Sequence, residues 1–509
     1  MRESVAWNGF AAFKEKGEFM NVRFNNKIIF RLRYPLIFFL CCYASSIWAT
    51  DDFQAWRQSM LSDFSSYKSK QDKAFAEFLK MHWVGVDALK RKPLYKKHKI
   101  VEPPKAPPEI KKDITEEPVI VKLPPRKLVP KKQVSPVISR VKGRSIKLQF
   151  FGNALVVPYD KSIKKRILGK IDKNAISDQW SVLAKSDYEP MMKQLKTLNK
   201  QLNLNDWGYA LLVDRVANKI YPNQKNEQAM FSWFVLIKSG YKSRIAYGNR
   251  AIYLLLATRQ PIYAAQSIKF NGLKYYLLDF NGGKQEKLAR VFTYDGDYPE
   301  SKQLFDMRIQ DAMVTGKDEV NRSLEFTYAQ KKYRIDTVSN KNLVAFMKTY
   351  PQVRWDAYFN SSFNSAARQK LASQLRPNLA GLSEKEAVNF LLRFVQTSLK
   401  YATDGDQFGY ENPLFPEESL FYPASDCEDR SFLFAWLVQT LLGLDVVGLH
   451  YPGHIATAVR LNMKVKGDSI RYKGKTYLVA DPTYINANVG NAMPKFKNAK
   501  AELIEINRI

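Results

Sequence analysis

The sequence predicts an α+β fold, in which helices are grouped before consecutive antiparallel strands. Near the C-terminus, "HIATAVRL" alternates with period two, and "KTYLVAD" is a β-rich run that ends in an acid. The run "GDSIRYKG" supplies a polar turn between them, and helix-like apolar segments come before them. A similar order is present earlier in the chain, so we expect two related units.

The first 50 residues have the features of an export signal. Lys27, Arg31 and Arg33 form a basic region, and "YPLIFFLCCYASSIWA" supplies an apolar core followed by small residues. This core is too short to span a bilayer comfortably. The sequence therefore predicts export to the periplasm, either with a cleaved signal or with an uncleaved inner-membrane anchor.

Residues 51–100 begin with an amphipathic helix, and residues 101–142 form a spacer rich in proline and lysine. In the helix, apolar residues recur at spacings of three and four: Phe53, Met60, Phe64, Tyr67, Ala74 and Phe78. Its polar face carries both signs of charge, which favours packing or oligomerisation over binding to a membrane surface. We expect the spacer to be extended and unpacked, with a reach of about 110 Å.

The formal net charge is +31, and part of this excess lies in the spacer and just before it. In an exported protein, such charge favours an anionic membrane or cell-envelope surface over nucleic acid. A solvated tail without a partner is the alternative interpretation.

From residue 143 onward the chain repeats itself. The pair of strands expected in "IKLQFFGNALVVPYD" matches "RSLEFTYAQKKYRID", placing Phe150 against Phe326 and Asp160 against Asp336. The segment "MFSWFVLIKSGYKSRIAY" lies on "LFAWLVQTLLGLDVVGLH" without a gap. We therefore expect a degenerate copy at 143–285, a strand-rich connector at 286–345 that begins the second copy, and a catalytic copy at 346–509.

The two copies differ in their reactive residues. Gap-free pairing puts Gln224 opposite Cys427 and Ala251 opposite His454, whereas Asp279 lies opposite Asp481. The second copy also has a long loop of aromatic, proline and acidic residues before Cys427, and such loops are commonly functional. These differences predict that the first copy is inactive and the second is the working one.

Cys427 would be the single thiol of a mature chain, because Cys41 and Cys42 lie in the signal. A lone thiol in an oxidising compartment is either used or buried, so a catalytic and a structural role both stay open. Ser425 or Asp426 is the expected N-cap of the helix that follows. At a helix start, the N–H groups and the helix dipole should lower the pKa of the Cys427 thiol.

His454 is the preferred base for this thiol, and Asp481 is the expected orienting acid. His454 begins an alternating strand, whereas His450 precedes a Pro-Gly turn that would fix a base less firmly. Asp481 ends the next strand, and antiparallel pairing could bring it to the imidazole. Asp481 has a structural alternative, which is to cap the turn at Pro482-Thr483.

The stretches "DCEDRSFLFAWLVQTLLGL", "GHIATAVRL" and "YLVADPTY" resemble the transglutaminase-like superfamily of papain-type thiol enzymes. The resemblance covers about the last quarter of the chain and, more weakly, the preceding copy. It implies a papain/transglutaminase-like core with Cys427 as nucleophile, His454 as base and Asp481 as orienting acid. It also implies a thioester acyl-enzyme and a protein or peptide substrate.

The oxyanion hole is expected to use the Cys427 N–H and a donor from the preceding loop. The loop candidates are Tyr410, Asn412 and Tyr422. No cofactor is expected, and the sequence contains no cluster with metal-ligand spacing. Three functions stay open: a cysteine hydrolase of peptide or isopeptide amides, an acyltransferase with an amine acceptor, and a non-catalytic envelope-binding protein.

Overall fold

The computed structural model describes residues 37–92, 102–107, 119–124, 144–248, 251–278, 280, 289–363 and 365–507. Three basic residues of the expected signal (Lys27, Arg31 and Arg33) and the acid Asp279 lie outside these ranges. The chain divides into two units, residues 1–68 and 69–509. Within the described ranges, no helix is both long and apolar enough to cross a membrane.

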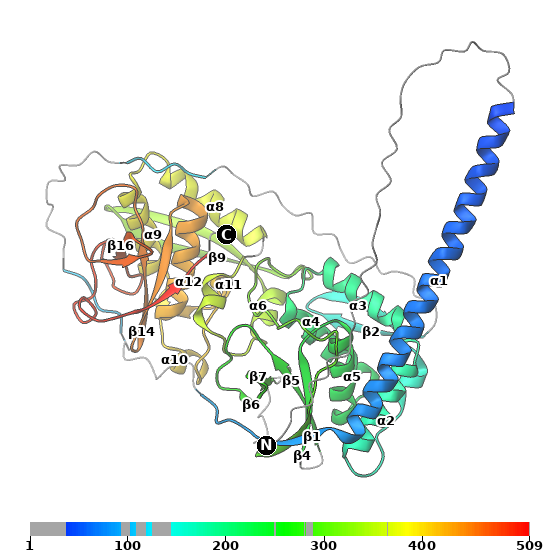
Figure 1. Ribbon diagram of the computed structural model, residues 1–509. Coiled ribbons are helices and arrows are strands. Elements are labelled where there is room, and N and C mark those ends of the chain that lie inside the picture. Colours follow the sequence, from blue (N-terminus) through cyan, green and yellow to red (C-terminus); the bar gives the residue numbers. More distant parts are fainter. Residues whose placement is uncertain are drawn as a thin grey trace. The chain divides into compact units, whose positions relative to one another are not determined.

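One helix, α1 (Ile37–Met81), runs through the boundary between the two units (Figure 1). In the first unit, its side chains at Phe53, Trp56, Met60 and Tyr67 are at least half exposed. The Phe64 side chain lies outside the described part of the chain. The first unit therefore carries a row of exposed apolar side chains.

In the second unit, the buried face of α1 differs from the predicted one. Ala74 is exposed and Phe78 is half-buried, whereas Phe75 and Leu79 are buried. The Phe75 ring meets the edge of Trp180 at a centroid distance of 4.8 Å. The predicted face was wrong here because contacts with aromatic side chains of a distant helix, rather than the spacing of three and four, select the buried side.

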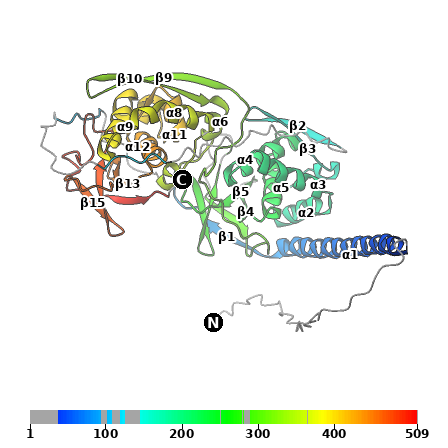
Figure 2. The same cartoon turned by 90° about the horizontal axis from the view of Figure 1, so that it is seen from above.

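The second unit contains two lobes, and each has a larger antiparallel sheet with helices against it (Figure 2). The sheet of the first lobe has the order β1-β8-β4-β5-β7-β6. Its strands are β1 (Trp83–Asp87), β4 (Ser243–Gly248), β5 (Ala251–Ala257), β6 (Gln266–Phe270), β7 (Leu273–Leu277) and β8 (Arg290–Tyr294). Its other elements are the hairpin β2 (Ser145–Phe150) and β3 (Asn153–Pro158), the short helix η1 (Lys161–Lys164), and helices α2 (Lys173–Lys185), α3 (Glu189–Gln201), α4 (Asp206–Ile220) and α5 (Lys225–Lys238).

The sheet of the second lobe has the order β15-β16-β14-β13-β17. Its strands are β13 (Val446–Tyr451), β14 (His454–Val459), β15 (Ser469–Tyr472), β16 (Lys475–Ala480) and β17 (Glu502–Glu505). A long hairpin, β9 (Glu319–Tyr328) and β10 (Lys331–Asn340), begins this lobe. The rest consists of the short parallel pair β11 (Lys400–Tyr401) and β12 (Ala424–Ser425), and of helices α6 (Lys341–Met347), α7 (Trp355–Phe359), α8 (Ser365–Leu379), α9 (Glu384–Ser398), α10 (Asp404–Phe408), α11 (Pro416–Phe421), α12 (Cys427–Leu437) and η2 (Val438–Leu442).

The two sheets share their strand order and their register. Five strands of the first sheet have the order β8-β4-β5-β7-β6, and the second sheet has the matching order β17-β13-β14-β16-β15. Gly248 pairs with Ala251 in the first sheet, and Tyr451 pairs with His454 in the second. The mixed content of helix and antiparallel strand agrees with the predicted α+β class.

The structure moves several expected boundaries. Strand β8, expected in the connector, pairs with β4, and β1 from the N-terminal segment pairs with β8. The sheet of the first lobe therefore includes one strand from before the expected copy and one from after it. The hairpin turns lie at 151–152 and 329–330, so the pairing of Asp160 with Asp336 was shifted by two residues. The error arose because alternating strands match almost as well after a slip of two.

Parts of the expected spacer pack against the second lobe, contrary to the prediction of a free tether. The Ala106 N–H donates to the Ile485 carbonyl over 2.8 Å, and the Val121 N–H donates to the Leu382 carbonyl over 2.9 Å. Val121 is buried. Proline removes a backbone donor but does not prevent the residues between prolines from pairing, which is why composition alone was misleading.

Candidate active site

The candidate active site begins at the N-terminus of α12, where Cys427 is the first helical residue. Asp426 is the N-cap with an extended backbone, and its N–H donates to the Asp429 carboxyl over 3.2 Å. The Arg430 N–H donates to the Asp426 carbonyl over 3.2 Å, which closes the first turn. The local sequence therefore starts the helix where the sequence analysis expected it.

The first turn of α12 is tied to the residue that follows His454. The Ser431 hydroxyl lies 2.8 Å from the Cys427 carbonyl and 3.0 Å from the Ile455 carbonyl. The Ile455 amide also hydrogen-bonds to the Cys427 thiol. The start of β14, which carries His454, is thereby held against the first turn of α12, although the two are far apart in sequence.

His454 and Asp481 form a buried pair. The His454 Nε2 lies 2.8 Å from the Asp481 Oδ2, and both side chains are almost completely buried. The other Asp481 oxygen, Oδ1, accepts the Thr483 N–H over 2.9 Å. One Asp481 oxygen thus contacts the imidazole while the other caps the turn, so the geometry is compatible with both predicted roles.

The other ring nitrogen of His454 is available as a base. Nδ1 is buried and has no hydrogen-bond partner among the described residues. If Nε2 donates its proton to Asp481, Nδ1 carries a lone pair. This tautomer is the one that a thiol needs for proton transfer.

The loop that carries Asp481 is held by Gln396, a residue that the sequence analysis did not single out. The Gln396 amide donates to the carbonyls of Asp481, Tyr484 and Ala487 over 2.8–3.2 Å. Its oxygen accepts the Asn486 N–H over 3.1 Å. A buried amide that satisfies four backbone groups fixes the path of this loop.

One signal for Gln396 was present in the sequence. In the matched helices of the two copies, Gln396 lies opposite Val216, so a buried polar residue appears only in the second copy. Arg430, which donates to the Gln396 and Leu399 carbonyls, is buried too and packs 5.1 Å from the Tyr401 ring centroid.

The predicted low pKa of the Cys427 thiol is contradicted. Burial raises the pKa of this thiol well above its ordinary value, and the carboxyls of Glu428 and Asp426 raise it further. The hydrogen bond from the Ile455 amide acts in the opposite direction but is outweighed. The sequence argument counted the helix dipole and missed the loss of hydration, which is larger at a fully buried site.

Several carboxyl groups around Cys427 are also shifted. Burial raises the pKa of Glu418 to about 8 and that of Asp404 to about 9, with neighbouring acids adding to the shift at Asp404. Burial and Glu428 raise the pKa of Asp426 and Asp429 well above the ordinary value. The Asp429 carboxyl accepts the N–H groups of Leu414 and Asp426, over 2.7 Å and 3.2 Å.

Three carboxyl groups lie close together in the folded chain, although their spacing in the sequence is not typical of metal ligands. Oxygens of Asp404, Asp426 and Glu428 all lie within 4.8 Å of one another, and all three residues are buried. Carboxylate oxygens are the ligands that calcium and magnesium prefer. The expectation that no such cluster exists was incomplete, because α10 and the start of α12 meet only in the folded chain.

The three candidate oxyanion donors are spread over the loop before Cys427. The Tyr410 side chain is exposed, and the Asn412 N–H donates to Asp404 over 2.6 Å. Tyr422 is half-buried, with its ring against Phe408. In the described part of the chain, no hydrogen bond joins any of these three side chains to Cys427, so their role stays a prediction.

The second histidine of this region has a different neighbour. The His450 Nδ1 lies 3.1 Å from the Glu502 Oε2 on the surface side of β13. The structure thus brings His454, and not His450, to the aspartate.

The three candidate residues are closed off from solvent. Cys427, His454 and Asp481 have exposed fractions of 0%, 1% and 3%. The Phe496 ring stacks on His454 at a centroid distance of 4.8 Å and also stacks on Tyr451. A substrate can reach the thiol only if some of this cover moves.

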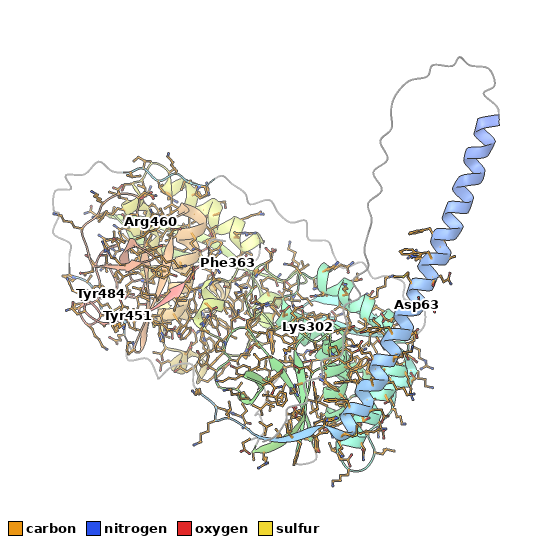
Figure 3. The ribbon with its side chains drawn as sticks, in the orientation of Figure 1. Asp63, Lys302, Phe363, Tyr451, Arg460 and Tyr484 are labelled. Carbon is orange, nitrogen blue, oxygen red and sulfur yellow. The ribbon has the colours of Figure 1, made fainter. Side chains whose placement is uncertain are left out.

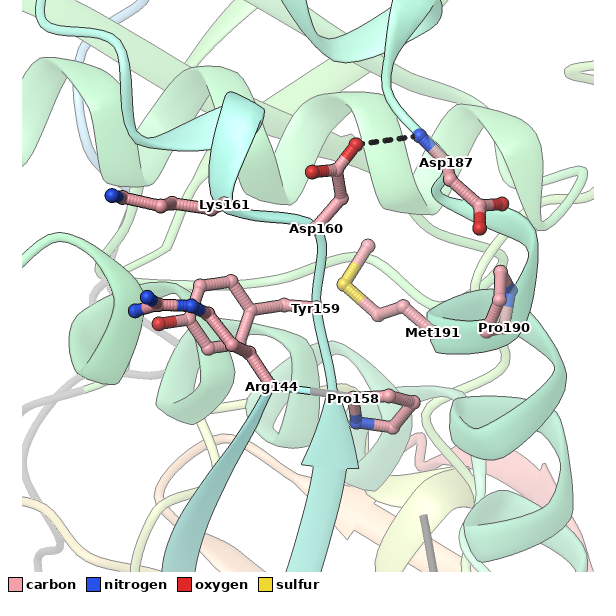
Figure 4. Close-up of a pocket in the computed structure, with 8 residues that line it drawn as sticks. All are labelled: Arg144, Pro158, Tyr159, Asp160, Lys161, Asp187, Pro190 and Met191. Atoms are coloured by element: carbon pink, nitrogen blue, oxygen red, sulfur yellow. Dashed lines mark hydrogen bonds between the residues drawn. The ribbon is translucent and has the colours of Figure 1, made fainter. Parts of the chain in front are cut away.

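The surface pocket of Figure 4 lies away from these residues, at the end of the β2/β3 hairpin in the first lobe. Its volume is about 400 Å³, and Asp160 accepts the Asp187 N–H across it over 2.9 Å. It contains no thiol or imidazole, so it does not replace the candidate site.

The first lobe lacks this arrangement at the matched positions. Gln224, which the sequence match pairs with Cys427, is the N-cap of α5 rather than its first helical residue, and Ala251 begins β5 as His454 begins β14. The Ile252 N–H, which matches the amide facing the thiol, donates to the Asn226 side chain over 2.8 Å. In the first lobe, the Asn226 carboxamide therefore accepts the strand N–H whose counterpart in the second lobe faces the Cys427 sulfur.

Comparison of the chain with protein-family models, with curated proteins and with solved structures gives no match.

Proposed function

We propose that the protein is a cysteine hydrolase of the papain-type, transglutaminase-like class, which cleaves peptide or isopeptide amide bonds at Cys427. The observation that carries the proposal is the buried hydrogen bond between the His454 Nε2 and the Asp481 Oδ2. This bond leaves Nδ1 as the ring nitrogen that can act as a base, and Ser431 joins the residue after His454 to the helix that carries the thiol. A nucleophile, a base and an orienting acid are the groups that acyl transfer needs.

The reaction proceeds in two halves. The Cys427 sulfur attacks the substrate carbonyl carbon while its proton passes to the His454 Nδ1, and Asp481 stabilises the imidazolium. The tetrahedral intermediate collapses by breaking the C–N bond, and the amine leaves with the proton from His454. Water then attacks the thioester, with His454 accepting its proton, and the acid product leaves as the thiol is restored.

The buried environment determines the resting state of the pair. Because burial raises the pKa of the Cys427 thiol, this environment disfavours a preformed thiolate. The proton therefore moves during attack, as in a serine–histidine pair, and not beforehand. This step depends on Asp481 more strongly than a preformed thiolate would.

The experiment is a substrate profile with matched variants. Purified protein is incubated with envelope proteins, peptide libraries, isopeptides and peptidoglycan peptides, and new amines and acids are measured by mass spectrometry. We expect cleavage by the wild type, none by Cys427→Ala, and near-normal cleavage by Gln224→Ala at the matched position of the first lobe. A loss in Gln224→Ala as large as that in Cys427→Ala would refute the inactive first copy, whereas no cleavage by the wild type favours the envelope-binding hypothesis.

One observation favours acyl transfer as a second candidate function. Phe496 and Tyr451 cover His454 with aromatic surface, and the three site residues are almost completely buried. Exclusion of water would extend the life of a thioester until an amine arrives. Adding a fluorescent primary amine to the same reactions measures the ratio of amide to acid product.

The proposal places the enzyme in the periplasm, supported by the basic and apolar start of the sequence. The exposed row at Phe53, Trp56, Met60 and Tyr67 is available for oligomerisation through α1. Reporter fusions after Ser139 should be active only outside the cytoplasm. Activity confined to the cytoplasm would exclude this location.

A further inference from the structure

A short segment from the expected spacer, residues 102–107, pairs with the loop that follows Asp481. The Ala106 N–H donates to the Ile485 carbonyl over 2.8 Å, and the Ile485 N–H donates to the Pro104 carbonyl over 2.9 Å. Lys105 and Ile485 form a parallel bridge. The segment thus binds by main-chain hydrogen bonds, as an added strand does.

The segment also packs on the cover of the candidate site. Ala106 packs against an apolar cluster that contains Tyr451, Tyr484 and Phe496. Figure 3 shows Tyr451 and Tyr484 in the same part of the second lobe. Phe496, a member of this cluster, stacks on His454, so the segment packs on the same apolar cluster that covers the imidazole.

We propose that the backbone of Ile485 is where an extended peptide substrate pairs, and that the chain's own residues 102–107 occupy this place as an internal strap. The strap holds Phe496 and its neighbours over His454, so the thiol stays inaccessible until a peptide takes its place. This inference rests on the proposed function for the identity of the substrate. It does not depend on that function for the position of the strap.

The chemistry of the segment indicates the class of substrate. Its sequence is "EPPKAP", in which three prolines favour an extended backbone and leave few N–H groups to satisfy. Pairing with Ile485 uses one carbonyl and one N–H two residues apart, and Lys105 between them is not buried. A partner therefore needs an extended backbone and a small residue at the position of Ala106, which fits polypeptide better than sugar.

A second part of the spacer keeps the chain on this lobe. The Val121 N–H donates to the Leu382 carbonyl, and the Glu384 N–H donates to the Val119 carbonyl, both over 2.9 Å. Arg376 donates to the Pro124 carbonyl over 2.6 Å. Two anchored stretches, 102–107 and 119–124, raise the effective concentration of the strap at its site.

The test measures how fast Cys427 is alkylated in the full chain. Cys41→Ser and Cys42→Ser form the background, so that iodoacetamide reports on Cys427. Ala106→Pro removes the N–H that bonds to Ile485, whereas Lys105→Ala leaves the main-chain bonds intact and serves as the matched control. We expect alkylation to be at least ten times faster in Ala106→Pro and unchanged in Lys105→Ala.

Two further measurements test directly whether residues 102–107 leave Ile485. Hydrogen exchange at the Ile485 amide reports whether the strap has left, and a variant with residues 102–107 replaced by Gly and Ser removes it outright. Adding the peptide EPPKAP to that variant should slow alkylation again. Fast exchange at Ile485 with unchanged alkylation overturns the proposal, as does continued protection of Ile485 after the replacement.

The readouts separate this proposal from the proposed function. If the strap exists but the protein is not a hydrolase, alkylation rises without cleavage of any substrate. If the protein is a hydrolase without a strap, cleavage is seen, yet the replaced and wild-type segments give equal alkylation rates.

Discussion

Glu418→Gln should flatten the dependence of stability on pH. Glu418 lies on α11, is buried, and accepts the Phe415 N–H over 3.0 Å. Burial raises its pKa to about 8, from an ordinary value of 4.5. The folded protein therefore keeps this carboxyl protonated at pH 7, while the unfolded chain releases the proton.

The size of the effect follows from this shift. Below pH 4.5 both states are protonated, and the contribution of Glu418 to the free energy of unfolding is fully present. As the pH rises towards 8, that contribution is lost by up to about 1.4 kcal/mol per unit, because the folded state binds more protons. The full shift corresponds to an upper limit of about 5 kcal/mol.

Urea unfolding of the wild type, Glu418→Gln and an exposed control, Glu325→Gln, between pH 5 and 8 measures this loss. Glutamine keeps an oxygen that can accept the Phe415 N–H and has no proton to lose. The wild type and the control should lose stability in parallel, and Glu418→Gln should lose less. Parallel curves for all three proteins would show that Glu418 is ionised in the folded state and refute the reasoning.

Three further outcomes are expected at the candidate site. Asp481→Asn should preserve the fold but reduce kcat by several powers of ten, since the His454 tautomer is no longer fixed; a change in KM alone would contradict this. Alkylation of Cys427 should be slow at neutral pH and rise steadily above pH 9, because burial raises the pKa of its thiol, and a plateau below pH 8 would point to a preformed thiolate. His450→Ala should leave turnover unchanged, because its partner is Glu502 and not Asp481; a large loss would show that the wrong histidine was chosen.

The helix and strand that carry Cys427 and His454 could be predicted because their signals are local. A cysteine between an acidic lead-in and an apolar run indicates a helix start, and a period-two pattern beginning at His454 indicates a strand. Gap-free matching of the two copies also placed Ala251 and His454 at the same strand position. Each of these inferences needs only neighbouring residues and a fixed period.

The remaining features depend on contacts between distant segments. Asp404 meets Asp426 and Glu428 only after α10 packs near the start of α12. The spacing of these residues in the sequence therefore does not predict the acid cluster. The Cys427 pKa was predicted with the wrong sign because sequence gives the helix dipole but not the depth of burial. The binding of residues 102–107 was missed for the same reason, since their acceptor Ile485 lies far along the chain.

The difference between the lobes extends beyond the two reactive residues. In the first lobe, the strand amide at Ile252 is already satisfied by Asn226, so a thiol placed at Gln224 would compete for that donor. Val216 stands where Gln396 organises the acid-bearing loop of the second lobe. The shared register of the sheets therefore supplies only the scaffold, whereas the proposed chemistry requires a donor, a base and a loop anchor, which together distinguish the second lobe.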